Sequence, residues 1–190
     1  MRFLDWDTVT GPAALPVTVD EFVDHGRLNG LTVDRQPDLI DRELTAATSR
    51  AEHYLRRSLI TQTLKALYLP DDSDDQRSLV IVLPRGNVQA VNSISSAGAA
   101  IDPATYKLEW NTVTLGAPIA GAATVEFTSG YGDAGSDVPD QIREGILQYA
   151  TTLYEGRTGE RQTKFVATAE RTLPAGVIDL WRPFQIELSG

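Results

Sequence analysis

The 190-residue chain has no cysteine, one methionine and two histidines. Without cysteine, a disulfide framework and thiolate chemistry are excluded, and the composition is compatible with a reducing cytosol. Neither His25 nor His53 belongs to an HExxH motif, so a zinc site is not expected. His53 is expected on the polar face of a helix. We therefore predict no metal and no cofactor.

Positive charge is also in short supply, with 17 Lys and Arg against 26 Asp and Glu and a formal net charge of -9. An acidic chain is poorly suited to gripping phosphates over its whole surface, so DNA wrapping is not expected. A surface that repels DNA remains open. No apolar run approaches the ~20 residues of a membrane helix, and residues 1–7 lack the regions of a signal peptide.

Helix signals occur in the first third and the last third of the chain. Thr18 and Glu21 have capping-box spacing, and Asn29-Gly30 is a stop signal. Pro37 and Pro139 suit first helical turns, and apolar residues recur behind both at helical spacing. Helices are therefore predicted at about 18–28, 37–57, 138–156 and 175–182.

Short runs rich in β-branched and aromatic residues fill the middle, and turn residues separate them. No helix is predicted between these runs, so the sheet should be mostly antiparallel. Residues 1–17 contain Gly11, Pro12 and Pro16 and are expected to be irregular. Strands are predicted at 61–69, 78–83, 88–95, 106–110, 112–115 and 124–128.

This order predicts an α+β fold: a helical core with an inserted, mostly antiparallel β subdomain. The core would contain two long helices plus short N- and C-terminal helices. The predicted parts are an N-terminal extension (1–17), a first helical part (18–60), the β subdomain (61–130), a second helical part (138–156), and a charged arm with a C-terminal docking segment (157–190).

Two motifs with possible chemistry are better explained as turns. Gly130–Gly135 matches G-x-G-x-x-G after a predicted strand, but the helix signal comes only at Val138-Pro139, whereas a dinucleotide site needs the glycine turn to open directly into a helix. Asp71–Asp75 is dense in acid, yet Gln76 and Val82 stand where a calcium loop wants Gly and Glu. We interpret both as loops, with no cofactor.

The end of the chain poses the functional question. Trp181 and Phe184 either seal the helical core or anchor in a partner pocket, because aromatic residues and Arg dominate binding hot spots. Residues 157–172 are expected to form a mobile or partner-ordered arm. Its basic residues could touch phosphates, but a solvated or protein-facing role is favoured. The candidate docking residues are Leu173, Val177, Leu180, Trp181, Arg182 and Phe184, and the candidate arm contacts are Arg157, Arg161, Lys164 and Arg171.

Seven segments, in this order, give the chain a family resemblance. It resembles the head–tail connector, or adaptor, proteins of tailed phages and related gene-transfer particles, in the subgroup with a β insertion called phiE125 gp8-like. The resemblance covers roughly residues 15–185. The segments are Pro16–Glu21, Arg57–Thr63, Leu83–Val91, Phe127–Asp133, Val138–Ile142, Tyr154–Arg157 and Leu173–Phe184.

The resemblance implies a non-enzymatic ring, of twelve copies, that sits on the portal protein in the virion neck after synthesis in the host cytoplasm. Such a ring extends the DNA channel, through which DNA passes without specific contact, and offers a platform for the next neck, stopper or tail component. The C-terminal segment would dock on the portal, and it could order only on docking. Its deletion (173–190) would then spare the fold and abolish attachment. The longer, more charged arm departs from the pattern of the family.

Two other function classes remain open from the sequence. One is a small phage hydrolase or lyase that uses carboxylates on the β subdomain, which predicts a concave pocket holding perturbed acids. The other is a DNA-binding assembly factor that acts through the basic arm, which predicts steep salt dependence. The connector predicts oligomerisation instead.

Overall fold

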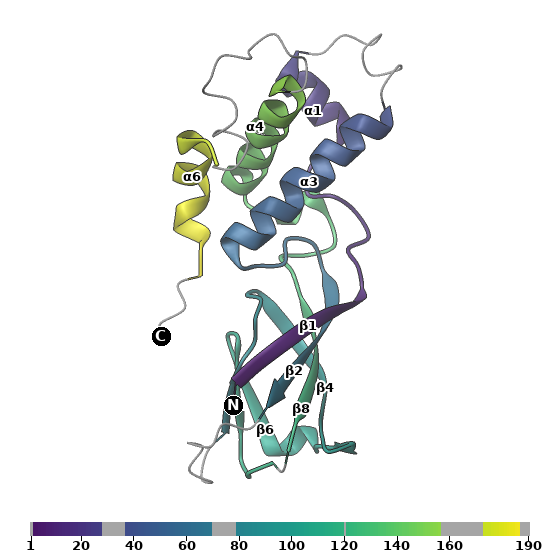
Figure 1. Ribbon diagram of the computed structural model, residues 1–190, viewed down its shortest axis with the longest axis vertical. Helices are drawn as coiled ribbons and strands as arrows, with labels where there is room; N and C mark the ends of the chain where they lie inside the picture. Colours follow the sequence, from purple (N-terminus) through teal and green to yellow (C-terminus); the bar gives the residue numbers. More distant parts are fainter. Residues whose placement is uncertain (1, 28–36, 70–78, 120, 157–172, 187–190) are drawn as a thin grey trace. The chain divides into compact units, whose positions relative to one another are not determined.

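A computed structural model describes residues 2–27, 37–69, 79–119, 121–156 and 173–186 (Figure 1). The chain divides into two compact units. We call Met1–Ala13 with Arg56–Asp133 the β unit, and Ala14–Leu55 with Ala134–Gly190 the helical unit. The fold is α+β, as predicted, and every described strand pairing is antiparallel.

The β unit contains two sheets. The five-stranded sheet has the order β1-β2-β8-β4-β5, and the three-stranded sheet has the order β3-β7-β6. A short 3-10 turn, η1 (Pro103–Thr105), precedes β6. The strands are β1 (Arg2–Thr10), β2 (Gln62–Leu69), β3 (Leu79–Val82), β4 (Val88–Ser96), β5 (Ala99–Ala100), β6 (Tyr106–Glu109), β7 (Thr112–Leu115) and β8 (Ala123–Ser129).

One buried cluster draws on both sheets. On β2, Leu64, Ala66 and Tyr68 alternate with more exposed residues and lie opposite the buried residues of β8. From the other sheet, Ile81 and Val113 join the same cluster. The Tyr68 hydroxyl donates to the Val82 carbonyl at 2.9 Å and so links the two sheets, and burial raises the pKa of Tyr68.

Strand β4 has an apolar spacing that would suit a helix. Val88, Val91 and Ile94 recur every third residue and all contact the core cluster. Register shifts against β8, between Val88 and Ala90 and between Val91 and Ser93, account for this spacing. Each shift reflects an extra residue in one strand, which returns the next apolar side chain to the buried face.

Strand β1 corrects the prediction that residues 1–17 are irregular. Arg2–Thr10 pairs with β2 along its whole length, from Arg2 opposite Leu69 to Thr10 opposite Thr63. Only Trp6 is even half-buried in this strand, so no alternation of apolar and polar residues marked it. Its ring packs on the core cluster, beneath the Arg85 guanidinium, which lies 4.7 Å from the ring centroid.

The helical unit contains α1 (Val19–Gly26), α3 (Pro37–Leu55), α4 (Asp140–Gly156) and α6 (Ala175–Trp181), with 3-10 turns η2 (Gly135–Asp137) and η3 (Arg182–Phe184). No helix among these described segments has the length and hydropathy of a membrane span. The buried apolar residues of the unit are Val17, Phe22, Ile40, Leu44, Ala47, Ala51, Leu55, Val138, Ile142, Ile146, Ala150, Leu173, Val177 and Trp181.

The predicted starts of α1 and α3 agree with the structure better than their predicted ends, whereas α4 begins at Asp140, two residues after the predicted start, and ends at Gly156 as predicted. Thr18 and Glu21 form the predicted capping box of α1. The predicted end of α1 at Asn29-Gly30 is wrong, because Arg27 adopts a left-handed conformation (φ 50°) and ends the helix after Gly26. Likewise α3 ends at Leu55, since Arg56 is left-handed (φ 56°).

Trp181 of α6 is completely buried against α4. Its indole N–H donates to the Ile142 carbonyl at 3.1 Å. A Cβ built on Gly145, one helical turn along, would lie 2.2 Å from Trp181 Nε1, a distance that atoms do not tolerate. The ring also contacts Tyr54 and Tyr149, with centroids 5.9 and 6.4 Å away. The absence of a side chain at Gly145 therefore allows Trp181 to pack in the helical core.

We expect Gly145→Ala to destabilise the protein by about 1–3 kcal/mol, because the methyl group overpacks the Trp181 ring. This loss outweighs the roughly 0.5–1 kcal/mol that Ala gains over Gly inside a helix. The matched control is Gly156→Ala on the same helix, where a Cβ would meet nothing within 4 Å. Urea unfolding should show loss in the first variant and no loss in the second. Equal midpoints would contradict the close contact.

Candidate docking surface

The C-terminal segment Leu173–Phe184 divides into buried and accessible residues. Val177 and Trp181 are four residues apart on one face of α6, and Leu173 comes just before the helix; all three are buried. Leu180 and Phe184 are half-buried, and Arg182 is exposed. The backbone is held beyond the helix as well, since Gln185 Nε2 donates to the Tyr54 carbonyl at 3.1 Å. Trp181 and Phe184 therefore differ: the first is buried in the helical core, and the second keeps part of its surface accessible to a partner.

Trp181 occupies the position expected of a residue that seals the helical core. A docking role for Trp181, Val177 or Leu173 would require α6 to leave the helical unit. Leu180, Arg182 and Phe184 need no such rearrangement, so they are the accessible ones among the predicted docking residues. We call these three residues the α6 contact face.

The burial of Trp181 corrects two expectations about this segment. Deletion of residues 173–190 would remove a fully buried tryptophan, so it would not spare the fold. The segment is also helical and packed within the single chain, so docking is not needed to order it. The arm contacts Arg157, Arg161, Lys164 and Arg171 lie outside the described residues, as does the acidic cluster Asp71–Asp75.

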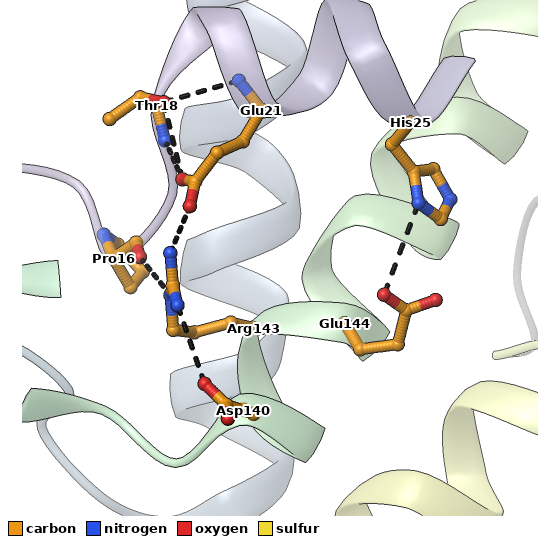
Figure 2. A network of polar contacts seen from close by, with 7 residues as sticks. All are labelled: Pro16, Thr18, Glu21, His25, Asp140, Arg143 and Glu144. Carbon is orange, nitrogen blue, oxygen red and sulfur yellow. Dashed lines mark hydrogen bonds and ion pairs between the residues drawn. The ribbon is translucent and has the colours of Figure 1, made fainter. Parts of the chain in front are cut away.

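A polar network ties the start of α1 to the start of α4 (Figure 2). Glu21 Oε2 accepts from the Thr18 backbone N–H at 2.8 Å, and the Glu21 N–H donates back to Thr18 Oγ1 at 3.2 Å. Arg143 of α4 pairs with Glu21 Oε1 and donates through Nε to the Pro16 carbonyl at 3.0 Å. Arg143 Nη1 also lies 3.4 Å from Asp140 Oδ1. The network therefore joins segments about 120 residues apart in sequence.

The network explains the pKa of Glu21. The hydrogen bond from the Thr18 backbone is the main cause that lowers the pKa of the carboxyl below its ordinary value of 4.5. Burial opposes this effect, and Arg143 lowers the pKa further. The signal for Glu21 was visible in the sequence as the capping box, but nothing near Arg143 identified its partner.

The two histidines are not brought together. His25 Nδ1 lies 3.9 Å from Glu144 Oε2 within the helical unit (Figure 2), and His53 lies exposed on α3, as predicted. No group of three His, Cys, Asp or Glu side chains with metal-binding geometry occurs within the described ranges.

Three loops of the β unit form one hydrogen-bonded cluster, and each carries a segment of the family resemblance. We call residues 56–61, 84–89 and 129–132 the three-loop cluster. The Gly86 N–H donates to the Arg56 carbonyl at 3.0 Å, and the Gly130 N–H donates to the Asn87 carbonyl at 3.0 Å. The Ser129 hydroxyl donates to the Gly86 carbonyl at 2.6 Å. These segments therefore have a structural role in holding the loops together.

The first glycine of the Gly130–Gly135 motif is required by this cluster. Gly130 has a φ of 154°, and a Cβ there would lie 2.5 Å from the Thr61 backbone nitrogen. The loop is closed by a hydrogen bond from the Thr61 N–H to the Gly132 carbonyl at 2.9 Å. Close backbone approach is a common reason for glycine in such a loop. The interpretation of this motif as a loop agrees with its backbone contacts.

We expect Glu21→Gln to lower stability at neutral pH by about 0.5–1 kcal/mol, since the carboxylate is partly exposed and Gln keeps part of the capping box. A lowered folded-state pKa contributes stability above the ordinary value of 4.5, and this contribution is lost as pH falls through the folded value. The difference between wild type and variant in urea unfolding should therefore shrink toward pH 3.

The Arg143→Met background is the control for this prediction. There, the effect of Glu21→Gln at pH 7 should be smaller, because the pair is already broken. An unchanged effect in both backgrounds, at both pH values, would exclude a contribution from the Glu21–Arg143 pair.

Comparison with known proteins gives a match in structure and none in sequence. No protein-family model matches the chain, and no curated protein matches it. Three solved structures share its fold over 98% of this chain and 99% of theirs. They come from the virion of a native gene transfer agent particle (TM-score 0.72, 19% identity), the neck of an empty particle computed with C6 symmetry (0.73, 19%) and the neck of a native particle computed with C12 symmetry (0.69, 20%).

Proposed function

We propose that this protein is a structural head–tail connector that forms a ring in the neck of a phage or gene-transfer particle. The observation that carries the proposal is the end-to-end structural match to chains of gene transfer agent necks. The match covers both units, so it includes the way β1 and the β2–β8 segment are interleaved with the helices. The resemblance to the connector subgroup with a β insertion supports the same role independently.

In the proposed particle, twelve copies form a ring under the portal protein, and the ring extends the DNA channel. Head-to-tail contacts between copies close into a ring when the rotation between neighbours allows it. The solved neck structures, computed with C6 and C12 symmetry, support a ring for this chain too. A net charge of -9 favours passage of DNA without adhesion.

In this proposal the α6 contact face docks on the portal protein. The second partner of the ring is the next neck, stopper or tail component. Leu180 and Phe184 offer partly accessible apolar surface, and Arg182 between them offers a charge. Leu173, Val177 and Trp181 serve docking indirectly, because their burial fixes α6 in place. Repetition of a weak contact around a ring multiplies its strength.

A non-enzymatic role fits the neck neighbours and a pocket in the described β unit. Its lining consists of Ala104–Lys107, Thr114, Gly116 and Ala117 and includes no carboxylate. A carboxylate-dependent hydrolase would need acids in such a place. The carboxyl whose pKa is lowered, Glu21, lies instead in the capping network of the helical unit.

The direct test is native mass spectrometry of the purified protein alone and after mixing with its cognate portal protein. We expect a complex with twelve copies per portal ring. A protein that stays monomeric and ignores the portal at micromolar concentration would contradict the connector function.

We expect the triple variant Leu180→Ala/Arg182→Ala/Phe184→Ala to fold but to lose portal binding by at least tenfold, because anchor residues dominate such interfaces. The matched control is Arg42→Ala/Thr45→Ala/Ser49→Ala, which removes the same charge from exposed positions of α3. Circular dichroism checks the folds. Portal binding is also measured for Arg182→Glu, which reverses one charge and leaves the apolar packing intact. Normal binding by both α6 variants would exclude this face as the docking surface.

A further inference from the structure

Among the described residues, nothing around Trp110 explains why a tryptophan occupies this position. It is 92% exposed, by far the most exposed large apolar residue among those described. The sequence pattern assigned it to a strand, but β6 ends at Glu109, and Trp110 begins the two-residue turn to β7. Its φ is 59°, in a turn position where glycine is usual. A bulky side chain there adds backbone strain and gains no burial within the chain.

The sheet face beside Trp110 is also unusual. The register places Val80, Thr114 and Lys107 in one row, and Val82, Thr112 and Glu109 in the next. These positions alternate with the buried Ile81 and Val113, so they lie on the outward face of the three-stranded sheet. Val80 and Val82 are each 46% exposed. The two valines of β3 and Trp110 are thus exposed apolar side chains around an otherwise polar sheet face.

The same hairpin carries a pocket at its other end. The pocket has a volume of about 480 Å³ and is lined by the turn at Ala104–Lys107 and by Thr114, Gly116 and Ala117. This volume lies within the range of sites that hold a small organic molecule, about 300–1,000 Å³. The pocket volume is therefore large enough for an indole ring. Tyr106 and Trp110 are four positions apart along the hairpin, which is about 13 Å of strand.

The chemistry around Trp110 selects a protein as its partner. Glu109 precedes it, and the chain as a whole is acidic, so neither an anionic lipid surface nor a nucleic acid phosphate is favoured. Tryptophan is among the residues most enriched at protein hot spots. Lys107, which lines the pocket, supplies a positive charge that complements Glu109. A projecting anchor and a matching pocket on one chain, at opposite ends of a hairpin, make a head-to-tail pair.

We propose that Trp110 of one copy inserts into the Ala104–Ala117 pocket of the next copy. The contact is heterologous, because two different surfaces of the chain meet, and it leaves a free anchor and a free pocket at the ends of any open assembly. Glu109 of the first copy then approaches Lys107 of the second. This inference rests on the proposed ring, for which it names the contact between neighbours.

The absence of cysteine allows a direct test by disulfide trapping. Glu109→Cys places a thiol beside the intact Trp110, and Ala117→Cys places one at the pocket. The two single variants, one of them tagged, are mixed on the portal protein and oxidised. We expect a disulfide between the two different chains at least tenfold above its yield in a Trp110→Ala background. The exposed side chain makes Trp110→Ala a mild change to the fold itself.

Ala90→Cys is the matched control for Ala117→Cys, since it also replaces an exposed alanine of the β unit. It should form no disulfide with Glu109→Cys above the background yield. The same samples are read by native mass spectrometry. A ring without the disulfide, or a disulfide yield that Trp110→Ala leaves unchanged, overturns this contact and leaves the connector function standing. A Trp110-dependent disulfide in open chains that never close supports the contact and overturns the ring.

Discussion

The helical unit depends on the contact between Trp181 and Gly145. The ring can lie this close to α4 only because residue 145 has no side chain, and in this position the indole N–H reaches the Ile142 carbonyl. A buried indole needs such a partner. Tyr54 of α3 and Tyr149 of α4 pack around the same ring. One residue near the end of the chain thereby joins three helices that the sequence separates widely.

The β unit is held differently, by backbone hydrogen bonds among loops. The three-loop cluster uses carbonyls and N–H groups of Arg56, Gly86 and Gly130, and the Ser129 hydroxyl adds a bond to Gly86. Such contacts require certain conformations more than certain side chains. That explains how weak sequence motifs in these loops can accompany a shared fold at 19–20% identity.

Local signals in the sequence predicted most of the helices and strands. The capping box at Thr18, the strand-like composition of the segment that forms β2 and the proline at the start of α3 each act within a few residues, and the structure follows them. Features set by distant contacts were not accessible in this way. The side chains of β1 are nearly all exposed, so no apolar pattern marks this strand. Arg143 pairs with Glu21, which lies 122 residues away in sequence. Trp110 adopts a positive φ in its turn, which is unfavourable for a residue other than glycine. For the docking segment, the sequence identified aromatic residues but not that Trp181 faces inward.

The interleaved order of the two units has a consequence for synthesis on the ribosome. β1 is made before the other described elements, yet its partner β2 emerges only after α1 and α3, and β2 gains its other neighbour only with β8. The helical core in turn lacks Trp181 until α6 is translated, after every other described helix and strand. Neither unit can therefore be completed before part of the other has been made. A chain that stops before α6 lacks part of its helical core, and a chain that stops before β8 also lacks part of its larger sheet. Prematurely ended copies would thus expose unfinished cores to proteolysis instead of competing with complete ones.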